Sequence, residues 1–427
     1  MNINGFKSMQ STTLHQYITE QRKLIILEYE LEKNKKKQTK IPCIDLFFIA
    51  RSNDTTGKKR KWTTTLPLPK NLIPPDYLIQ TDSTYVNVSD KIIVEFVGWN
   101  GYKIEGTVTK IRNGELTAVF DLTWSGEIAR YKCIITFAPN DIVFKRKLEA
   151  LKELPKLNIS LQNMLCKKYP TIQIIPNTNL SLPRNYNFNE SQKKAIRMAI
   201  SNPFSLIQGP PGTGKTHTIG AIAIQALRNQ PGKKVLICGT TNVSINSLLE
   251  IVGDMVQEEG YKVCWPASTA RDYLKEDNLT KEQKLMTLYK SCHMDTPNSK
   301  IFYKLFNKHS ERTEPETVEM NKLRDILEGE IIKESNVIFS TLDSSRKKSI
   351  VKNIGQISTL IVDEATLSVE STMIIPLSLC PDRFVLVGDH KQLGPEPSFD
   401  ELKNEGFYES MFERIIKEKS CLRNSIM

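Results

Sequence analysis

The segment Gly209–Thr216 constrains this chain more than any other feature, because it reads GPPGTGKT and matches the phosphate-loop pattern G-x-x-x-x-G-K-[ST]. It lies between an apolar run, Phe204–Ile207, and a stretch with helical periodicity, Thr218–Leu227. Its glycines allow backbone N–H groups to surround phosphate oxygens without obstruction. A nucleotide site explains this context far better than a plain glycine turn. The predicted nucleotide-binding residues of the loop are Gly209, Pro210, Pro211, Gly212, Thr213, Gly214, Lys215 and Thr216.

The last two residues of the loop have specific chemical roles in such a site. Lys215 brings a positive charge to the β- and γ-phosphates, and the Thr216 hydroxyl can ligate Mg²⁺. The helix that follows presents its positive end to the same anion.

A pair of carboxylates, Asp363 and Glu364, follows the apolar run Leu360–Val362. Ligands of α/β sheets bind at the carboxyl ends of the strands, where this pair would lie. There Asp363 would hold Mg²⁺, and Glu364 would orient and deprotonate the water that attacks the γ-phosphate. Alone, an Asp-Glu pair is more often an ordinary exposed strand end. Downstream of a phosphate loop, the functional interpretation is favoured.

Two glutamines are further candidates for nucleotide contacts. Gln392 lies three residues after Asp389, at the end of the apolar run Phe384–Val387, and could hydrogen-bond a γ-phosphate or its attacking water. A turn capped by Asp389 with an exposed Gln392 explains the same residues equally well. Gln192 could pair with an adenine edge, although a helix start capped by Asn189 accounts for that segment by itself.

The rest of the chain indicates two kinds of sheet. Short β-rich runs with an Asn113-Gly114 turn predict a small antiparallel barrel, and Lys58–Trp62 is a candidate basic-aromatic loop on it, with a plain exposed loop favoured. Beyond residue 189, helical stretches alternate with apolar runs, which predicts an α/β fold with a parallel sheet covered on both faces. We expect an amphipathic stalk helix and basic tail at 1–40, the barrel as a nucleic-acid-binding accessory domain at 41–144, a helix and connector at 145–188, and a nucleotide-binding domain at 189–427 with a helical insertion at about 271–334.

Composition narrows the class of protein. Lys plus Arg (59) exceed Asp plus Glu (48), giving a net charge of +11 that is compatible with a polyanionic partner. No run approaches the roughly 18–20 apolar residues of a membrane span. The eight cysteines are scattered, which disfavours a zinc site or a disulfide framework. We expect an intracellular protein of the cytoplasm or nucleus.

The order of these motifs resembles that of superfamily 1 helicases of the senataxin and nonsense-mediated-decay type, with the immunoglobulin mu-binding helicase as the most similar branch. The segments that carry the resemblance are Asn189–Gln192, the phosphate loop, Asp363–Ala365 and Gly388–Pro395. The resemblance also covers the N-terminal helix, the barrel and the Asn-Asp-Ile segment that begins at Asn140. It implies a P-loop NTPase domain of the RecA-like type.

The resemblance implies roles for individual residues. Gln192 would contact adenine, Lys215 and Thr216 would bind phosphate and Mg²⁺, Asp363 and Glu364 would coordinate metal and activate water, and Gln392 would sense the γ-phosphate. It implies ATP and Mg²⁺ as cofactors, single-stranded RNA or DNA as partner, and 5′ to 3′ translocation. The implied nucleic-acid contacts follow two strands: Thr240, Thr241, Asn242, Ser340 and Thr341.

This sequence departs from the family pattern in two ways. Leu367 occupies a position where relatives usually carry Gln, whereas Glu370 matches the acidic residue that often follows. The chain also stops at Met427, about where a second RecA-like domain with catalytic arginines would begin. Because an arginine finger contributes about 10³–10⁵ in rate, we expect nucleotide binding with weak hydrolysis. The alternatives are a catalytically defective binding or regulatory module and, with less support, a nucleotide kinase or GTPase.

Overall fold

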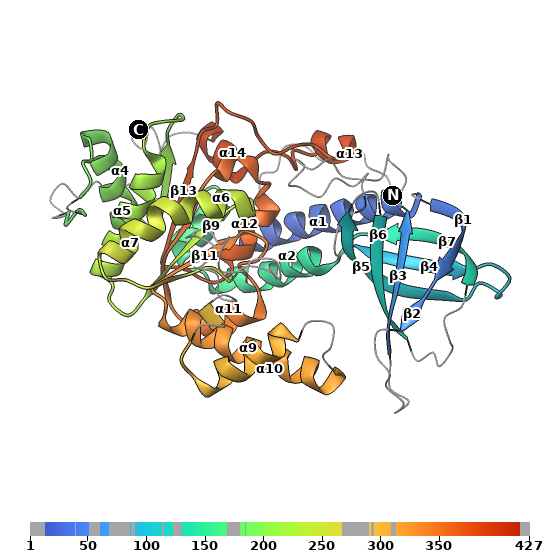
Figure 1. Cartoon of the computed structure of the whole chain (residues 1–427). Coiled ribbons are helices and arrows are strands. Elements are labelled where there is room, and N and C mark those ends of the chain that lie inside the picture. Colours follow the sequence, from blue (N-terminus) through green and yellow to red (C-terminus); the bar gives the residue numbers. More distant parts are fainter. Residues whose placement is uncertain are drawn as a thin grey trace.

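The computed structural model describes residues 13–38, 40–50, 60–67, 86, 90–112, 115–122, 130–168, 180–183, 185–266, 290–291, 294–308 and 313–418. An antiparallel sheet and a parallel sheet lie at opposite ends of the molecule and are joined by two helices, α1 (Leu14–Gln38) and α2 (Ile142–Glu153) (Figure 1). A helical hairpin projects from the parallel-sheet end. None of the described helices combines the length and apolarity needed to cross a lipid bilayer.

The antiparallel sheet closes into a barrel. Its order is β1-β7-β4-β5-β6-β3-β2, and the two outermost strands are separated in the chain only by Phe48. One continuous stretch therefore pairs with β7 on one side and with β3 on the other. The strands are β1 (Lys40–Phe47), β2 (Ile49–Ala50), β3 (Arg60–Pro67), β4 (Lys91–Phe96), β5 (Lys103–Arg112), β6 (Glu115–Leu122) and β7 (Arg130–Ala138).

The barrel core corrects one prediction. Trp62 was expected at the tip of an exposed basic loop, but Arg60–Trp62 belongs to β3 and the Trp62 ring is 1% exposed, packed with Phe48 and Phe120. Alternation along the strand explains the difference, because every second residue of a barrel strand faces the interior. Residues 58–59 and the predicted turn residues 113–114 lie outside the described residues.

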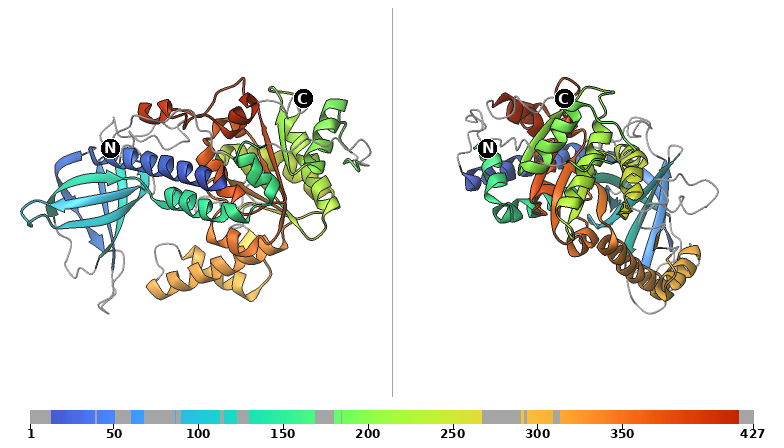
Figure 2. Two further views of the ribbon diagram at one scale, coloured as in Figure 1. Left: turned by 180° about the vertical axis from the view of Figure 1, so that it is seen from behind. Right: turned by 90° about the vertical axis from the view of Figure 1, so that its left-hand side faces the viewer.

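Helices α1 (Leu14–Gln38) and α2 (Ile142–Glu153) connect the barrel to the parallel sheet (Figure 2). The basic end of α1 contains a buried lysine: Lys36 is 2% exposed and pairs with Asp90 at 2.6 Å. A buried ammonium requires such a partner. Along the helices, Lys147 of α2 contacts Glu28 of α1 at 2.7 Å.

The parallel sheet has the order β10-β11-β9-β12-β13-β8, and all its described pairs are parallel. Successive side chains of one strand enter different cores: Leu360 packs in one cluster and Ile361 in the other. Helices therefore cover both faces, as the sequence predicted. The strands are β8 (Phe204–Gln208), β9 (Lys234–Gly239), β10 (Val263–Cys264), β11 (Val337–Thr341), β12 (Ile357–Val362) and β13 (Arg383–Gly388).

The two faces of the sheet carry different helices. One core includes residues of α4 (Glu190–Ser201), α5 (Lys215–Asn229), α6 (Asn242–Leu248) and α7 (Asp254–Glu258), with a π-helical turn at Leu249–Gly253. The other includes residues of α1, α2, α3 (Ile159–Leu165), α11 (Lys348–Asn353), α12 (Glu370–Leu377) and α14 (Met411–Lys417). The short helix α13 (Asp400–Asn404) packs through Leu402 against Leu24 of α1.

The predicted helical insertion contains α9 (Pro297–Asn307) and α10 (Glu314–Glu334). These helices share a small core of their own, which includes Phe302, Phe306 and Leu327. Residues 271–289, 292–293 and 309–312 of the predicted insertion lie outside the described residues.

Candidate functional site

The predicted phosphate loop and the two predicted acidic segments follow three neighbouring strands. The loop follows β8, Asp389 follows β13, and Asp363 follows β12, and these strands are adjacent in the order β12-β13-β8. The amide of Gly209 donates to the carbonyl of Gly388 at 3.1 Å, so the pairing of β8 with β13 continues into the loop. The parallel topology thus brings segments distant in sequence to one edge of the sheet.

The loop has a backbone conformation that its glycines make possible. Gly212 and Gly214 adopt φ values of 77° and 82°, a region that side chains other than glycine rarely occupy. Gly214 is the N-cap of α5, and a Cβ added there would lie 2.4 Å from Nε2 of Gln192. The turn before α5 is therefore both conformationally restricted and closely packed.

Lys215 points toward the acidic segment across the loop. Its Nζ donates to the carbonyl of Gly209 at 2.9 Å and lies 3.9 Å from Oε1 of Glu364. Thr216, the next residue of the first turn of α5, is half-buried. The structure thus brings the predicted phosphate lysine and the predicted water-activating carboxylate into one site.

The acidic pair occupies two different environments. Asp363 is 8% exposed, its amide donates to the carbonyl of Cys238 at 2.9 Å, and its Oδ1 accepts the amide of Glu364 at 2.9 Å. Burial, together with the neighbouring Glu364 carboxylate, raises the pKa of Asp363 to about 6. Glu364 is half-exposed and adopts a left-handed conformation with φ 49° and ψ 42°. Such strained non-glycine residues concentrate at functional sites.

Asp389 organises the third segment. Its carboxylate is buried and accepts Nε2 of Gln392 at 3.0 Å, the amide of Lys391 at 3.1 Å and Nε2 of Gln208 at 3.4 Å. These hydrogen bonds, with that from Gln392 the largest, lower the pKa of Asp389. The geometry is that of the capped turn, with Gln392 exposed and folded onto Asp389. A γ-phosphate contact by Gln392 stays a prediction.

Gln192 links the start of α4 to the phosphate loop. Its Nε2 donates to the carbonyl of Thr213 at 3.0 Å, and its Oε1 accepts the amide of Asn189 at 2.9 Å. The Asn189 side chain accepts the amide of Gln192 in return, which completes a capping box. The capped helix start is thus observed, and the same glutamine also reaches the predicted nucleotide site.

The residues predicted to contact nucleic acid lie at the ends of β9 and β11, away from the phosphate loop in the strand order. Thr341, the last residue of β11, is paired in register with Gly239, the last residue of β9. Thr240 is the residue after Gly239. Thr241 caps α6, and Asn242 is exposed at its first position. Ser340 is fully buried, and its hydroxyl donates to the carbonyl of Thr341.

Three further residues of structural importance were not predicted from the sequence as a group. Tyr17 of α1 donates to Oε1 of Glu370 at 2.7 Å, and Arg414 of α14 donates to both carboxylate oxygens of Glu370 at 2.8 Å. All three side chains are at least nine-tenths buried. We call them the Glu370 cluster. It fixes the start of α12, six positions after Glu364 in the sequence. No local pattern indicates a contact between residues this far apart.

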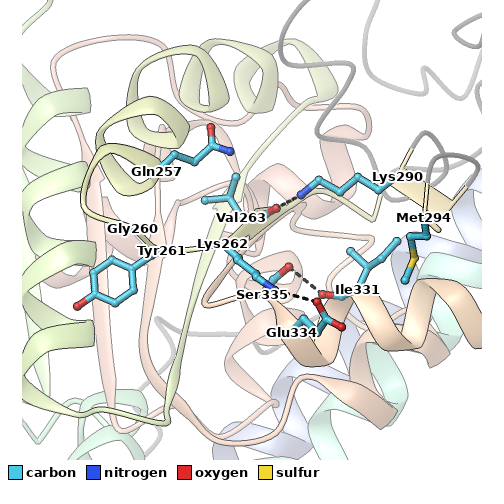
Figure 3. A pocket seen from close by; sticks show the side chains of 10 residues that line it. All are labelled: Gln257, Gly260, Tyr261, Lys262, Val263, Lys290, Met294, Ile331, Glu334 and Ser335. Carbon is cyan, nitrogen blue, oxygen red and sulfur yellow. Dashed lines mark hydrogen bonds and ion pairs between the residues drawn. The ribbon is translucent and has the colours of Figure 1, made fainter. Parts of the chain in front are cut away.

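A hollow of about 480 Å³ lies at the opposite edge of the sheet, beside the amino ends of β10 and β11 (Figure 3). Lys262 and Glu334 form an ion pair of 3.0 Å in its wall. Lys290 donates to the carbonyl of Val263, and burial lowers the pKa of Lys290. This hollow contributes no residue to the predicted nucleotide site.

The chain is similar to one protein-family model and to several known proteins. A family model described as an AAA domain matches residues 187–264 and 303–396. The chain is 31% identical over 254 residues to the "Regulator of nonsense transcripts 1 homolog" of Neurospora crassa, covering 58% of this chain and 22% of that protein. It is 28% identical over 371 residues to the "DNA polymerase alpha-associated DNA helicase A" of Saccharomyces cerevisiae. That match covers 80% of this chain and 54% of the yeast protein. It is 31% identical over 250 residues to the "ATP-dependent helicase upf1" of Schizosaccharomyces pombe. That match covers 56% of this chain and 25% of the other protein.

Proposed function

We propose that this chain, which is similar to helicases of the Upf1/NAM7-like group, carries the RecA-like domain of a superfamily 1 helicase and binds Mg-ATP and single-stranded nucleic acid as the N-terminal part of an ATP-dependent helicase. The chain spans about half or less of the length of the curated relatives described above. The observation that carries the proposal is the distance of 3.9 Å between Nζ of Lys215 and Oε1 of Glu364. Lys215 follows a loop in which Gly212 and Gly214 adopt left-handed conformations.

The residues present fit a magnesium nucleotide. Among the described residues no group of three or more His, Cys, Asp and Glu could enclose a metal ion by itself. A cation here would instead be held by the Thr216 hydroxyl and the buried Asp363 carboxylate together with phosphate oxygens, as Mg²⁺ prefers. When bound, Mg²⁺ neutralises negative charge on the phosphates.

The protein side chains supply the remaining chemistry. Lys215 would exchange its bond to the Gly209 carbonyl for phosphate oxygens, which are stronger acceptors. Glu364, half-exposed beside Lys215, would orient and deprotonate the attacking water. Asp389 would hold the Gln392 amide near that water. The backbone amides of Gly212–Lys215 would bind phosphate, since the N-terminus of a helix favours anions.

Single-stranded nucleic acid would lie over the ends of β9 and β11. Thr241, Asn242 and Thr341 carry hydroxyl and amide groups there, and Thr341 is paired in register with Gly239. Such groups position a sugar-phosphate backbone without reading its sequence. The net charge of +11 supports a polyanionic partner.

Nucleotide binding to the whole chain tests the proposal directly. We expect a thermal shift and saturable binding with Mg-ATP, both lost in Lys215→Ala, because the loop then lacks its phosphate cation. Lys262→Ala is the matched control: this lysine is exposed, paired with Glu334 and remote from the loop. Absence of any nucleotide-dependent shift in the wild-type chain would contradict the proposal.

The variant Glu364→Gln separates the enzyme from a catalytically defective binding module. Glutamine keeps the shape of the side chain but cannot accept a proton at neutral pH. Slower basal ATP turnover in this variant, with Mg-ATP affinity preserved, supports an enzyme. Absence of ATP turnover in both the wild type and the variant assigns the chain to the binding module.

A further inference from the structure

The backbone places the carboxylate of Glu364. Its Oε1 lies 3.9 Å from Nζ of Lys215, which is too long for a hydrogen bond. The hydrogen bonds described for Glu364 involve main-chain atoms: its amide donates to Oδ1 of Asp363 at 2.9 Å, and its carbonyl accepts the amide of Leu367 at 3.0 Å. The carboxylate therefore faces Lys215 because Glu364 has a left-handed conformation. A residue other than glycine keeps such a conformation only where the surrounding structure imposes it.

The 3₁₀ turn Ala365–Leu367 that follows Glu364 is buried but has few polar anchors. Thr366 lies against the end of β13, where its Cγ2 would be 3.2 Å from a Cβ added to Gly388. The hydroxyls of Thr366 and Ser371 are buried and have no hydrogen-bond partner among the described residues. Within this stretch the described side-chain hydrogen bonds are those of Glu370. Glu370 is therefore the polar anchor of the turn.

The Glu370 cluster attaches the turn to two helices that lie outside the parallel sheet. Arg414 of α14 binds both carboxylate oxygens of Glu370 at 2.8 Å, a two-pronged contact that fixes orientation as well as distance. Tyr17 of α1 contacts Oε1 at 2.7 Å. The preceding residue, Val369, forms an antiparallel bridge with Ser410, the N-cap of α14. Two consecutive residues are thus held by backbone and side chain, which restricts the short link back to Glu364.

We propose that Tyr17, Glu370 and Arg414 are positioning residues for ATP hydrolysis. They hold the 3₁₀ turn so that Glu364 keeps its left-handed conformation and faces Lys215. The inference rests on the proposed function, because it concerns the step in which Glu364 acts as the base. In that step the water oxygen bonds to the γ-phosphorus, the bond to the bridging oxygen of ADP breaks, and a proton of the water passes to Glu364. The cluster acts through the backbone of the turn and not by contact with the nucleotide.

Single-turnover hydrolysis of Mg-ATP, with the whole chain in excess, tests the inference alongside equilibrium binding of Mg-ATP. Tyr17→Phe keeps the ring and removes the hydroxyl that contacts Glu370. We expect hydrolysis to be about tenfold slower, because a small misplacement of a catalytic group is costly, whereas Mg-ATP affinity should stay within about twofold of the wild type. Arg414→Lys, which keeps the cation but loses the two-pronged contact, should have the same effect. Hydrolysis by Lys215→Ala gives the background rate.

Combination with Glu364→Gln distinguishes positioning from a general loss of structure. If the Tyr17 hydroxyl acts through Glu364, the double variant Tyr17→Phe/Glu364→Gln should hydrolyse ATP at the rate of Glu364→Gln alone. Effects that are independent of each other would multiply. A further slowing in the double variant would therefore overturn the inference.

Tyr408→Phe is the matched control. It removes the same atom from another partly buried tyrosine, whose hydroxyl accepts the amide of Phe399 at 3.1 Å in the segment that leads into α14. We expect this variant to hydrolyse ATP at the wild-type rate. Circular dichroism and urea unfolding check that the variants are folded under the assay conditions.

The outcomes separate this inference from the proposed function. Unchanged hydrolysis in Tyr17→Phe, or an equal loss in Tyr408→Phe, refutes the positioning role, while Mg-ATP binding that is lost in Lys215→Ala still supports the nucleotide site. A parallel loss of affinity and hydrolysis in Tyr17→Phe also refutes it, because the cluster would then support the whole site and not Glu364. A wild type that binds Mg-ATP without hydrolysing it has no step for the cluster to support, which refutes the inference alone. A wild type that binds no Mg-ATP refutes both.

Discussion

At the scale of single residues, Gly214 combines two constraints that can be tested separately. Gly214 and Gly232 both have positive φ, 82° and 87°, but only at Gly214 would a Cβ meet another atom, Nε2 of Gln192 at 2.4 Å. We expect both alanine variants to lose about 1–2 kcal/mol of stability from the left-handed backbone. Gly214→Ala should additionally weaken Mg-ATP binding by about tenfold or more, equivalent to ~1.4 kcal/mol. Equal nucleotide affinity of the two variants would show that the close approach to Gln192 is unimportant.

Asp363 predicts a pH dependence of folding in the absence of Mg²⁺. The pKa of Asp363 is about 6 in the folded chain against 3.8 for an ordinary aspartate. Between these values the folded state binds more protons than the unfolded state, so this group makes stability fall as pH rises from about 4 to 6. Asp363→Asn should therefore be more stable than the wild type at pH 7.5, by roughly 2–3 kcal/mol at most. The same variant should lose Mg²⁺-dependent nucleotide binding.

Urea unfolding in EDTA at pH 4.5 and 7.5 measures this effect. The stability difference between Asp363→Asn and wild type should be larger at the higher pH. A difference that is constant across pH would mean that the Asp363 carboxyl is not responsible.

At the scale of secondary-structure elements, the Glu370 cluster holds α1, α12 and α14 together. Arg414→Met would leave the Glu370 carboxylate buried without its cation, which costs about 3–5 kcal/mol. Tyr17→Phe removes one hydrogen bond to a charged group and should cost about 1.5–3 kcal/mol. Lys262→Met is the control, because its pair with Glu334 is exposed and such pairs contribute about 0–1 kcal/mol.

Denaturant titration measures the free energy of unfolding of the three variants. We expect the largest loss for Arg414→Met, a smaller loss for Tyr17→Phe and the smallest for Lys262→Met. A cost for Arg414→Met no larger than that for Lys262→Met would show that the cluster does not stabilise the contact between these helices.

Features formed by residues close together in the sequence could be predicted, whereas contacts between distant residues could not. The phosphate loop could be predicted because Gly212, Gly214 and Lys215 act within one strand-loop-helix unit. The Lys36–Asp90 pair could not, because its partners are 54 positions apart and nothing local distinguishes a buried lysine from its neighbours. Trp62 was misplaced for a related reason: a short basic run obscured the alternation that directs this ring inward.

At the scale of the whole molecule, buried polar contacts fix both ends of helix α1. Lys36 pairs with Asp90 at the barrel end, and Tyr17 contacts Glu370 at the sheet end. Lys36→Met removes the ammonium that Asp90 contacts at 2.6 Å and should lower the stability of the barrel by about 3–5 kcal/mol. Hydrogen exchange of β4 should then become faster, while exchange of β12 should stay unchanged.

The control for this variant is Lys145→Met. Lys145 also pairs with an aspartate, Asp141 at the start of α2, at 2.7 Å, but the Lys145 side chain is 63% exposed. Little change in β4 exchange is expected there. Equal acceleration of β4 and β12 in Lys36→Met would show that barrel and sheet unfold as one unit.

The path of the chain through Phe48 has a topological consequence for the barrel. β1 and β2 are the two outermost strands of the sheet, and they are consecutive parts of one stretch of chain. Because β1 pairs with β7 and β2 pairs with β3, this stretch closes the barrel through its backbone and not through hydrogen bonds between two separate segments. A single backbone cut beside Phe48 would convert a closed ring into an open ribbon with two unsatisfied borders. Such borders recruit other chains, so we expect a chain cut at this position to self-associate more readily than the intact chain.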